Sequence, residues 1–319
     1  MPGFLDAQVK TLIKIVNKKP PDSLILGGDI FHKRNPSGDE LLAFGTFLES
    51  VKCKNIIVLR GNHDTIHKDG TSDTTLSLFK DRATIVEDTK TIAIGGVPFD
   101  FIPHYESEKK IVREVKKATN HVVGHFGFDG CVSNGAYLYE SRLKRRHFPK
   151  NKLSFLGHIH KPRKYKNVYI IGTPYSNTFG EANEQKYYME LFIREGKVDV
   201  LRKPINFGIR HICCGIDKLE QVAKKYITPQ FFTILRVKLD RLDEYVERQI
   251  YDNMLQKYNV NHLEFSFEDI LPKFTSDYAP DRKMFRIDDS VVEDYVESRN
   301  SIFSTEDLLD ALKEIRHEN

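Results

Sequence analysis

The chain has 319 residues, of which 40% are hydrophobic and 29% are charged, and its formal net charge is +4. This composition is typical of a globular protein with room for one large domain and one or two small ones. It excludes a membrane-spanning helix, because no apolar run of about 18 residues occurs, and the net charge is too small to indicate nucleic-acid binding by itself.

Neither a signal peptide nor a disulfide framework is expected. The N-terminus lacks the basic and apolar regions of a secretory signal. The four cysteines show no paired spacing of the kind that holds a metal; they are Cys53, Cys131, Cys213 and Cys214. We therefore expect a cytoplasmic protein with reduced cysteines.

The first half of the chain alternates helical patterns with short apolar strands. Apolar periodicity predicts a helix over residues 6–17, which Pro20 and Pro21 terminate. Ser37 and Glu40 form a capping-box pattern that opens a second helix. In chain order, the expected elements are that first helix, a strand at 24–26, the second helix to about residue 51, strands at 55–59, 84–87, 91–95 and 98–102, a helix at 107–118, and strands at 121–123, 153–156 and 168–171.

The texture of the sequence changes after residue 206, where strand and helix patterns predict a small β-α-β-α-β unit. Its strands are expected at 209–214, 231–239 and 262–267, and its helices at 217–226 and 242–258. A polar linker is expected to follow, and then two helical patterns at 290–298 and 305–316. Each tail helix carries an apolar stripe that fits either the chain's own body or a partner groove, and its isolation behind the linker favours the partner.

Four short motifs follow apolar strands directly, and each places a glycine before an Asp, Asn or His. In α/β proteins, functional side chains gather at the carboxyl ends of strands, where several loops converge. Glycine lets the backbone turn sharply there, so that the next side chain can point into a cleft. The motifs are Gly28-Asp29, Gly61-Asn62-His63-Asp64, Gly124-His125 and Gly157-His158-Ile159-His160.

These motifs supply ligands of the kind that a two-metal phosphoester-cleaving centre uses. Asp29 can bridge two cations, Asn62 offers an amide oxygen, and the histidines offer ring nitrogens. Mixed nitrogen and oxygen ligation suits Mn, Fe, Zn or Co better than Ca or Mg. Each motif alone is more often an ordinary turn, but four of them in this order are difficult to assemble by chance. The metal candidates are Asp29, Asn62, His125, His158 and His160.

Two further residues of the second motif are candidates for the chemical step. His63 follows Asn62 directly and could act on the leaving group of a phosphoester. Asp64 would then hold the tautomer of His63.

The order of the four motifs resembles the calcineurin-like metallophosphoesterase superfamily. Residues 28–37 are similar to the nuclease subunit of SbcCD-type double-strand-break repair complexes, including their tailed-phage relatives. The resemblance covers nearly the whole chain, strongly in the first half and only in layout beyond it. It implies an α/β fold: an αββα sandwich with a small α/β cap domain and a helical C-terminal tail. The implied divisions are a nuclease domain at 1–205, a DNA-capping domain at 206–271, a linker at 272–288 and a partner-binding region at 289–319.

The resemblance also implies an activity, Mn-dependent DNA cleavage in repair or recombination. Duplex ends would be cut exonucleolytically, and single strands or hairpins endonucleolytically, with two divalent cations, Mn or alternatively Mg. Asp29 would bridge both ions. One site would be completed by Asn62, His125 and His158, and the other would use His160. His63 with Asp64 would serve as the acid or phosphate-positioning pair, and His32 would be a second active-site histidine.

The sequence departs from the family pattern at its start. The family begins with a strand that ends in Asp-x-His, and no Asp-x-His precedes Asp29. The first strand of the core would then be missing, and one of the two metal sites would be incomplete. Three explanations remain open: a start upstream of Met1, a split gene, or a degenerate paralogue. The first two are favoured because every later ligand is present. This polypeptide alone is expected to bind at most one Mn tightly and to be a weak nuclease.

Basic side chains beside the ligand motifs are candidates for phosphate contacts, which give salt-dependent and sequence-independent affinity for DNA. A solvated basic surface is the alternative. The candidates are Lys33, Arg34, Arg142, Lys144, Arg145, Arg146, Lys161, Arg163 and Lys164.

The resemblance names partners as well: double- and single-stranded DNA, a coiled-coil ATPase subunit bound through residues 289–319, and a second copy of the chain. If the chain is phage-encoded, its location is the host cytoplasm. Two other functions remain open, a phosphatase on the same fold and a non-catalytic DNA-end-binding subunit.

Overall fold

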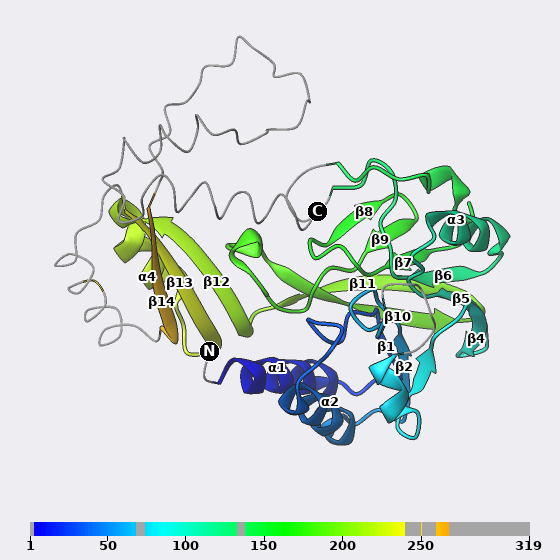
Figure 1. The fold of residues 1–319 in the computed structure, drawn as a ribbon, viewed down its shortest axis with the longest axis horizontal. Helices are drawn as coiled ribbons and strands as arrows, with labels where there is room; N and C mark the ends of the chain where they lie inside the picture. Colours follow the sequence, from blue (N-terminus) through cyan, green and yellow to red (C-terminus); the bar gives the residue numbers. More distant parts are fainter. Residues whose placement is uncertain (1–2, 68–73, 133–137, 240–249, 251–259, 268–319) are drawn as a thin grey trace, which may run out of the picture. The chain divides into compact units, whose positions relative to one another are not determined.

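Figure 1 shows the fold of the protein as a computed structural model. The structure describes residues 3–67, 74–132, 138–239, 250 and 260–267. The chain divides into two compact units, Met1–Glu268 and Asp269–Asn319. The second unit lies outside the described residues, and so do the expected linker, the expected tail helices and nearly all of the expected helix at 242–258.

Two helices cover one face of a three-stranded parallel sheet. The helices are α1 (Phe4–Lys18) and α2 (Gly38–Ser50), and the sheet has the order β1 (Ser23–Leu26), β2 (Asn55–Leu59), β3 (Thr84–Val86). Phe44, Phe47 and Val58 pack in the core between these layers. The predicted capping box is confirmed, because the Ser37 N–H donates to the Glu40 carboxylate over 2.8 Å and the Glu40 N–H donates to the Ser37 hydroxyl over 3.3 Å.

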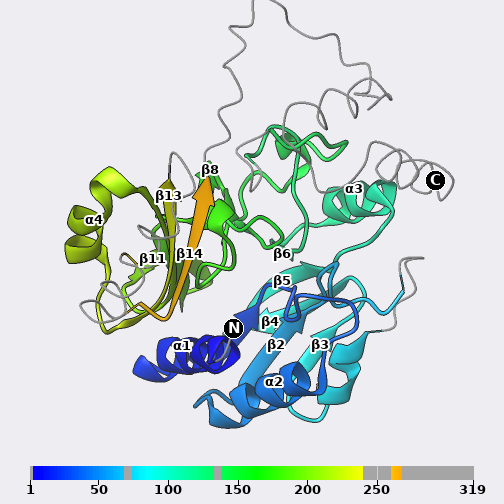
Figure 2. The same cartoon turned by 60° about the vertical axis from the view of Figure 1, so that its left-hand side comes forward.

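A six-stranded mixed sheet forms the second half of the sandwich. Its order is β4 (Lys90–Ile94), β5 (Val97–Ile102), β6 (His121–Gly124), β7 (Ser154–Leu156), β9 (Val168–Ile170), β8 (Arg163–Tyr165). The four central strands are parallel, and both edge strands are antiparallel to their neighbours. Helix α3 (Glu108–Lys117) lies beside this sheet (Figure 2). The short helix η2 (Arg145–His147) contacts α3. Ile111, Val115 and Phe148 anchor that layer in the core.

The two sheets face each other across a shared apolar core. Leu59 and Val86 of the first sheet belong to the same cluster as Phe99, Phe101 and Phe155 of the second. Helices therefore lie outside and sheets inside, in four layers. The predicted αββα sandwich is confirmed.

A long antiparallel hairpin was not predicted from the sequence. Its strands are β10 (Lys186–Arg194) and β11 (Lys197–Ile205), joined by a turn at Glu195 and Gly196, where both residues have positive φ. Met189, Leu191 and Val200 pack against the core between the sheets. Most residues of the hairpin are only partly buried or exposed, so no continuous apolar run marks either strand.

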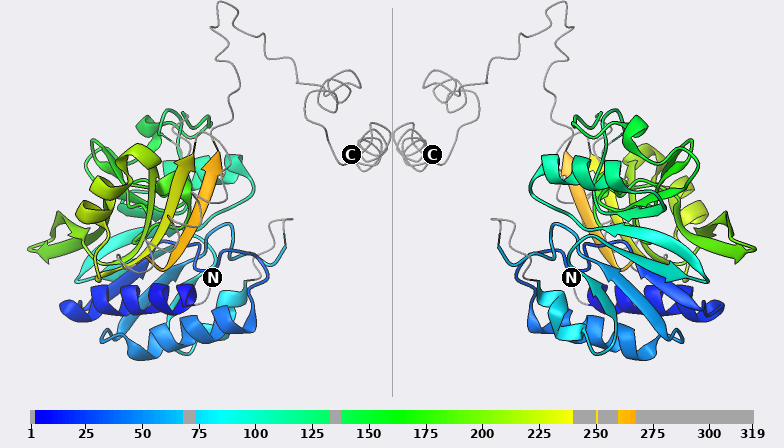
Figure 3. Two further views of the ribbon diagram at one scale, coloured as in Figure 1. Left: turned by 90° about the vertical axis from the view of Figure 1, so that its left-hand side faces the viewer. Right: turned by 90° about the vertical axis from the view of Figure 1, so that its right-hand side faces the viewer.

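A third sheet lies near the end of the described chain. It is parallel, with the order β12 (Gly208–Gly215), β13 (Phe231–Leu239), β14 (His262–Phe267), and α4 (Leu219–Tyr226) packs in its core through Leu219 and Ala223. The three expected strands are confirmed, and the domain boundaries at 205 and 271 stay predictions. Helix α1 lies beside this sheet (Figure 3) and contacts β12. The Phe4 ring meets Phe232 edge-on, with the ring centroids 6.2 Å apart.

Three more short helices belong to the described part of the chain. They are η1 (Thr75–Phe79), η3 (Phe179–Glu181) and η4 (Ile216–Lys218). Within the described residues, none of the helices is long and apolar enough to span a bilayer.

Candidate metal centre

Four candidate ligands lie just beyond the carboxyl ends of four parallel strands, two from each sheet. Asp29 follows β1 and Asn62 follows β2, while His125 follows β6 and His158 follows β7. Because the two sheets pack face to face, these strand ends converge on one place. The fold thus brings together side chains that are far apart in the sequence.

Two of these ligands sit in unusual backbone conformations. Asp29 has a φ of 53° and His158 a φ of 76°, both in the left-handed region that non-glycine residues rarely adopt. Gly28, with a φ of 94°, turns the chain before Asp29, and a Cβ at Gly28 would collide with the His125 ring. Such conformations cost about 1–3 kcal/mol each and persist only where the surroundings hold them.

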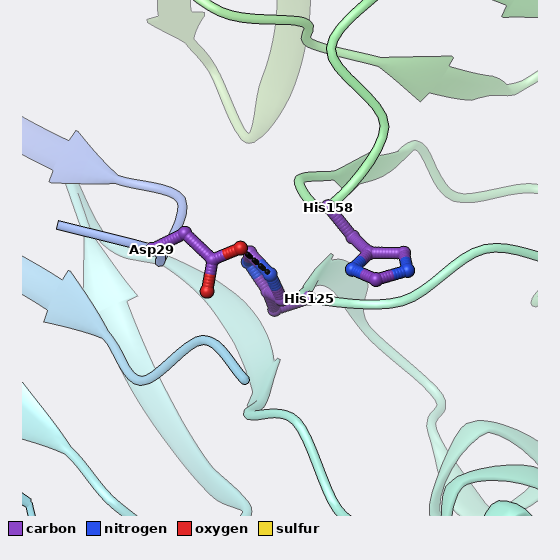
Figure 4. Close-up of side chains that lie close together, drawn as sticks. All are labelled: Asp29, His125 and His158. Atoms are coloured by element: carbon purple, nitrogen blue, oxygen red, sulfur yellow. Dashed lines mark ion pairs between the residues drawn. The ribbon is translucent and has the colours of Figure 1, made fainter. Parts of the chain in front are cut away.

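The side chains of Asp29, His125 and His158 lie close together (Figure 4), and the Asn62 side chain reaches both histidines. The Nδ1–H of His125 donates to the Gly27 carbonyl over 2.7 Å, which turns Nε2 towards Asp29 Oδ2 at 3.2 Å. The Asn62 side-chain oxygen lies 3.1 Å from His125 Nε2 and 3.0 Å from His158 Nδ1. The ligand atoms of Asp29, His125 and His158 all lie within 4.8 Å of one another. A carboxylate, an amide oxygen and two ring nitrogens in this arrangement fit a divalent cation that accepts mixed nitrogen and oxygen ligands.

Burial and neighbouring charges set the protonation of these groups. Burial alone would raise the pKa of Asp29, but the charge of His125 outweighs it and holds that pKa well below its usual range. Burial lowers the pKa of His158 to about 4, and the charge of His125 acts in the same direction. An ionised carboxylate and a neutral imidazole are the forms in which these side chains bind metals.

The expected pairing of Asp64 with His63 is wrong. Asp64 is fully buried, and its two carboxylate oxygens accept backbone N–H groups of Asp29, Ile30 and Gly61 over 2.8–2.9 Å and of Phe31 over 3.3 Å. Burial, followed by the charge of Asp29, raises the pKa of Asp64 to about 6, while the N–H donors act in the opposite direction. Asp64 therefore fixes the backbone of the turn that carries Asp29, and it does not orient the His63 ring.

His63 is oriented by backbone and metal-site groups instead. The backbone N–H of His63 donates to Asp29 Oδ1 over 2.9 Å. The ring Nδ1 of His63 lies 2.7 Å from the carbonyl oxygen of His32. The His32 and His63 rings are stacked, with centroids 6.2 Å apart and planes 11° apart. Both side chains are exposed. The structure thus places the two predicted active-site histidines together at the open side of the Asp29 turn.

His160 faces a partner that the sequence analysis missed. Its Nδ1 lies 2.7 Å from Oε1 of Glu181, a buried carboxylate in η3. Glu181 carries no motif, and nothing in the sequence around it marks a ligand or a site. His160 is not in the group formed by Asp29, His125 and His158.

A further histidine was also missed. His104 follows β5 just as the ligand motifs follow their strands, but Pro103 precedes it in place of a glycine. Its ring is stacked on His158 at 6.3 Å, and burial, with the charge of His125, lowers the pKa of His104 to about 4. The strand-then-histidine pattern at residues 98–104 was the signal that could have found it.

The predicted phosphate-binding residues fall into two groups. Several are held by protein partners: Arg34 donates to Thr65 and pairs with Glu106, and ion pairs join Arg142 to Glu108, Lys144 to Asp129 and Lys161 to Glu184. The others carry no such ion pair in the described structure. Exposed among them are Lys33, Arg145, Arg146 and Lys164, whereas Arg163 is half-buried.

Comparison with known proteins agrees with this geometry. A search of curated proteins finds no significant match. The family model of the calcineurin-like phosphoesterases matches residues 2–162, a stretch that includes all four strand-end motifs. The fold of that family uses divalent metals, in keeping with the group formed by Asp29, His125 and His158. The chain belongs to the calcineurin-like phosphoesterase family.

Proposed function

We propose that this metal-dependent phosphoesterase is a nuclease that hydrolyses DNA phosphodiesters with Mn, as part of DNA repair or recombination. The observation that carries the proposal is the exposed, stacked pair of His32 and His63 beside a four-donor cation site. A phosphodiester needs both a stabilised attacking oxygen and a proton for the leaving oxygen. The cation site and the histidine pair provide groups suited to these two tasks.

Asp29, Asn62, His125 and His158 would hold one cation. A divalent cation bound there supplies a Lewis acid that lowers the pKa of bound water and stabilises the charge that develops on the phosphate. The second proposed cation would be shared by Asp29 and His160. Asp29 is suited to this role because its two oxygens have different neighbours: Oδ2 lies 3.2 Å from His125 Nε2, and Oδ1 accepts the backbone N–H of His63 over 2.9 Å.

His63 would donate the proton to the leaving oxygen. With Nδ1–H donating to the His32 carbonyl, Nε2 is the ring nitrogen that exchanges the proton with the substrate. Asp29 Oδ1 accepts the backbone N–H of His63, which ties the backbone of this residue to the cation site. His32, stacked on it, would contact the phosphate.

DNA is favoured over a small phosphoester by the exposed basic side chains. Lys33 neighbours His32, and Lys164 follows the last histidine motif. Arg145 and Arg146 are exposed in η2. Such side chains give a salt-dependent attraction to a phosphate backbone, which a phosphatase acting on a single phosphate does not require.

The test compares two substrates in the presence of Mn²⁺. We expect nucleotides to be released from duplex ends, and the His63→Asn variant to lose at least 100-fold of that rate, because general acids contribute roughly 10²–10⁴-fold. His67→Asn, an exposed histidine further along the same loop, serves as the matched control and should keep the wild-type rate. Turnover of a phosphomonoester without DNA cleavage would identify a phosphatase. Unchanged activity in His63→Asn would show that this histidine performs no chemistry.

The proposed partner is a coiled-coil ATPase, bound through residues 289–319. The sequence pattern of these residues supports the proposal, since apolar residues at helical spacing are typical of helices that bind a partner groove. Deletion of residues 288–319 should abolish the association and leave Mn²⁺ binding unchanged. Retained association in the deletion variant would refute this part of the proposal.

A further inference from the structure

A segment between the histidine motif and the third sheet carries a buried ionic cluster. Glu181 is 3% exposed, and each of its carboxylate oxygens has a partner. Oε1 faces His160 Nδ1 at 2.7 Å, whereas Oε2 accepts from the Thr173 hydroxyl over 3.0 Å and from the Lys186 ammonium. Lys186 is itself buried and also lies 3.0 Å from the Thr173 hydroxyl.

Burying a charge is costly unless it is paired and hydrogen-bonded, so an ion pair at this depth calls for an explanation. The Glu181 carboxylate forms an ion pair with the buried Lys186 ammonium through Oε2, and its Oε1 lies 2.7 Å from His160 Nδ1. An ionised carboxylate has no proton to give and can only accept. The contact to His160 therefore requires a proton on Nδ1.

We propose that Glu181 is a positioning residue for His160: it accepts the Nδ1–H, fixes the ring and its tautomer, and so places the lone pair on Nε2 for a divalent cation. Carboxylates that orient a metal-binding histidine in this way are a general feature of metal sites. Lys186 is the counter-charge that keeps Glu181 ionised in a buried place. The part of the proposal that concerns the cation rests on the proposed function.

The backbone around Glu181 is held by the third sheet. Asn183 N–H donates to the His211 carbonyl over 3.1 Å, and the Asn183 side chain donates to the Cys213 carbonyl over 3.0 Å. At the other end of the segment, the Ser176 hydroxyl lies 3.1 Å from His211 Nδ1. Strand β12 thus supports the segment that supports His160, which gives the third sheet a role in shaping the site.

The first measurement reads the tautomer directly and needs neither a metal nor activity. The full chain is labelled with ¹⁵N-histidine, and ring ¹H–¹⁵N spectra are recorded at pH 8.5, where imidazoles are ordinarily neutral. The His160 signals are assigned by their loss in His160→Gln. We expect His160 to carry its proton on Nδ1. A wild-type ring protonated on Nε2 would overturn the proposal, whatever any variant does.

The second measurement uses Glu181→Gln and titrates Zn²⁺ as a diamagnetic probe. The amide oxygen will face Lys186, so the amide NH₂ faces His160 and favours a bare Nδ1. We therefore expect the His160 proton to move to Nε2. The Zn²⁺ concentration that shifts the His160 signals should rise roughly 10- to 100-fold, the usual effect of losing such a partner.

Glu264→Gln is the matched control, because it removes a carboxylate paired with Arg236 at 2.7 Å in the third sheet. It should leave the His160 tautomer and the Zn²⁺ titration unchanged. An unchanged tautomer and titration in Glu181→Gln would contradict the proposal. A wild-type His160 that holds its proton on Nδ1 but does not respond to Zn²⁺ would support the role of Glu181 and contradict the proposed second cation.

Discussion

The Asp29 side chain owes its position to close packing of two turns. The Gly61 N–H and the Asp29 N–H both donate to Asp64 Oδ2, which joins the turn after β1 to the turn after β2. A Cβ at Gly61 would collide with the Asp29 carboxylate and its backbone nitrogen. The cation site thus depends on an approach that only glycine permits.

Gly61→Ala is therefore predicted to push Asp29 out of place and to weaken Mn²⁺ binding by at least roughly 10-fold, the lower end of the effect of losing support for a ligand. Calorimetric titration of Mn²⁺ measures it. Gly38→Ala is the control, since a Cβ there meets nothing within 4 Å, and its affinity should match the wild type. Equal Mn²⁺ affinities in the two variants would mean that the site does not need the close contact between Gly61 and Asp29.

Asp64→Asn tests the corrected role of Asp64. An amide has one acceptor oxygen for four backbone donors, and its NH₂ would face the others, so the free energy of unfolding should fall by about 1–3 kcal/mol. Urea denaturation measures the change. Asp129→Asn is the control, because this carboxylate pairs with Lys144 away from the cation site, and it should leave the free energy of unfolding close to the wild-type value. An Asp64→Asn variant that kept its stability but lost catalytic rate would contradict this role and would support the predicted pairing of Asp64 with His63.

At the scale of elements, the carboxylate of Asp100 joins β5 to the end of α3 and the start of β6. It accepts from the Thr91 hydroxyl over 2.7 Å, from the Asn120 side chain over 2.9 Å and from the N–H groups of Thr119 and Asn120 over 3.1 Å. Burial raises the pKa of Asp100, but these hydrogen bonds outweigh it and the net shift is downward.

This shift predicts a pH dependence of stability. A carboxyl whose folded pKa is depressed stabilises the fold above its unfolded pKa of about 3.9, and that contribution is lost as the pH falls through the folded pKa. The difference in unfolding free energy between wild type and Asp100→Asn should be largest at pH 7 and should shrink below about pH 4. Urea denaturation at several pH values measures it, and a difference that grew with acid would contradict the assignment.

The elements that the sequence predicted share a physical origin. Strands β2, β6 and β7 are short and mostly buried, and β1 is short and partly buried; each leads into a glycine or a polar turn. The apolar side chains of these strands therefore mark them before any tertiary contact is known. The hairpin of β10 and β11 could not be predicted in the same way. Its burial comes from docking one face against the core between the sheets, and that contact is decided by the fold.

The candidate site shows the same division. The four strand-end ligands could be predicted because each follows a marked strand, and the structure brings them together. Glu181 could not, since its partner His160 lies 21 residues away and its burial depends on Lys186. Asp64 was misassigned because a carboxylate next to a histidine in sequence suggests pairing, whereas the backbone donors of a neighbouring turn hold it.

At the scale of the whole molecule, the sandwich concentrates its metal-binding side chains in one place. Among the described residues, Asp29, His125 and His158 form a single group that can hold an ion, and Asn62 adds an oxygen to it. We therefore predict one tight Mn²⁺ per chain in residues 1–319. Calorimetry measures the stoichiometry, and two tight ions per chain would contradict this prediction.

Cleavage of end-labelled duplex DNA by the wild type and by Asp29→Asn, with Mn²⁺ or with a chelator, tests the central claim most directly. We predict slow nucleotide release by the wild type that depends on Mn²⁺ and stops with the chelator. Asp29→Asn should lower the rate at least 100-fold, because it removes the charge around which the cation site is built. Equal cleavage by both proteins, or cleavage that persists in the chelator, would contradict the assignment of this site to metal-dependent DNA hydrolysis.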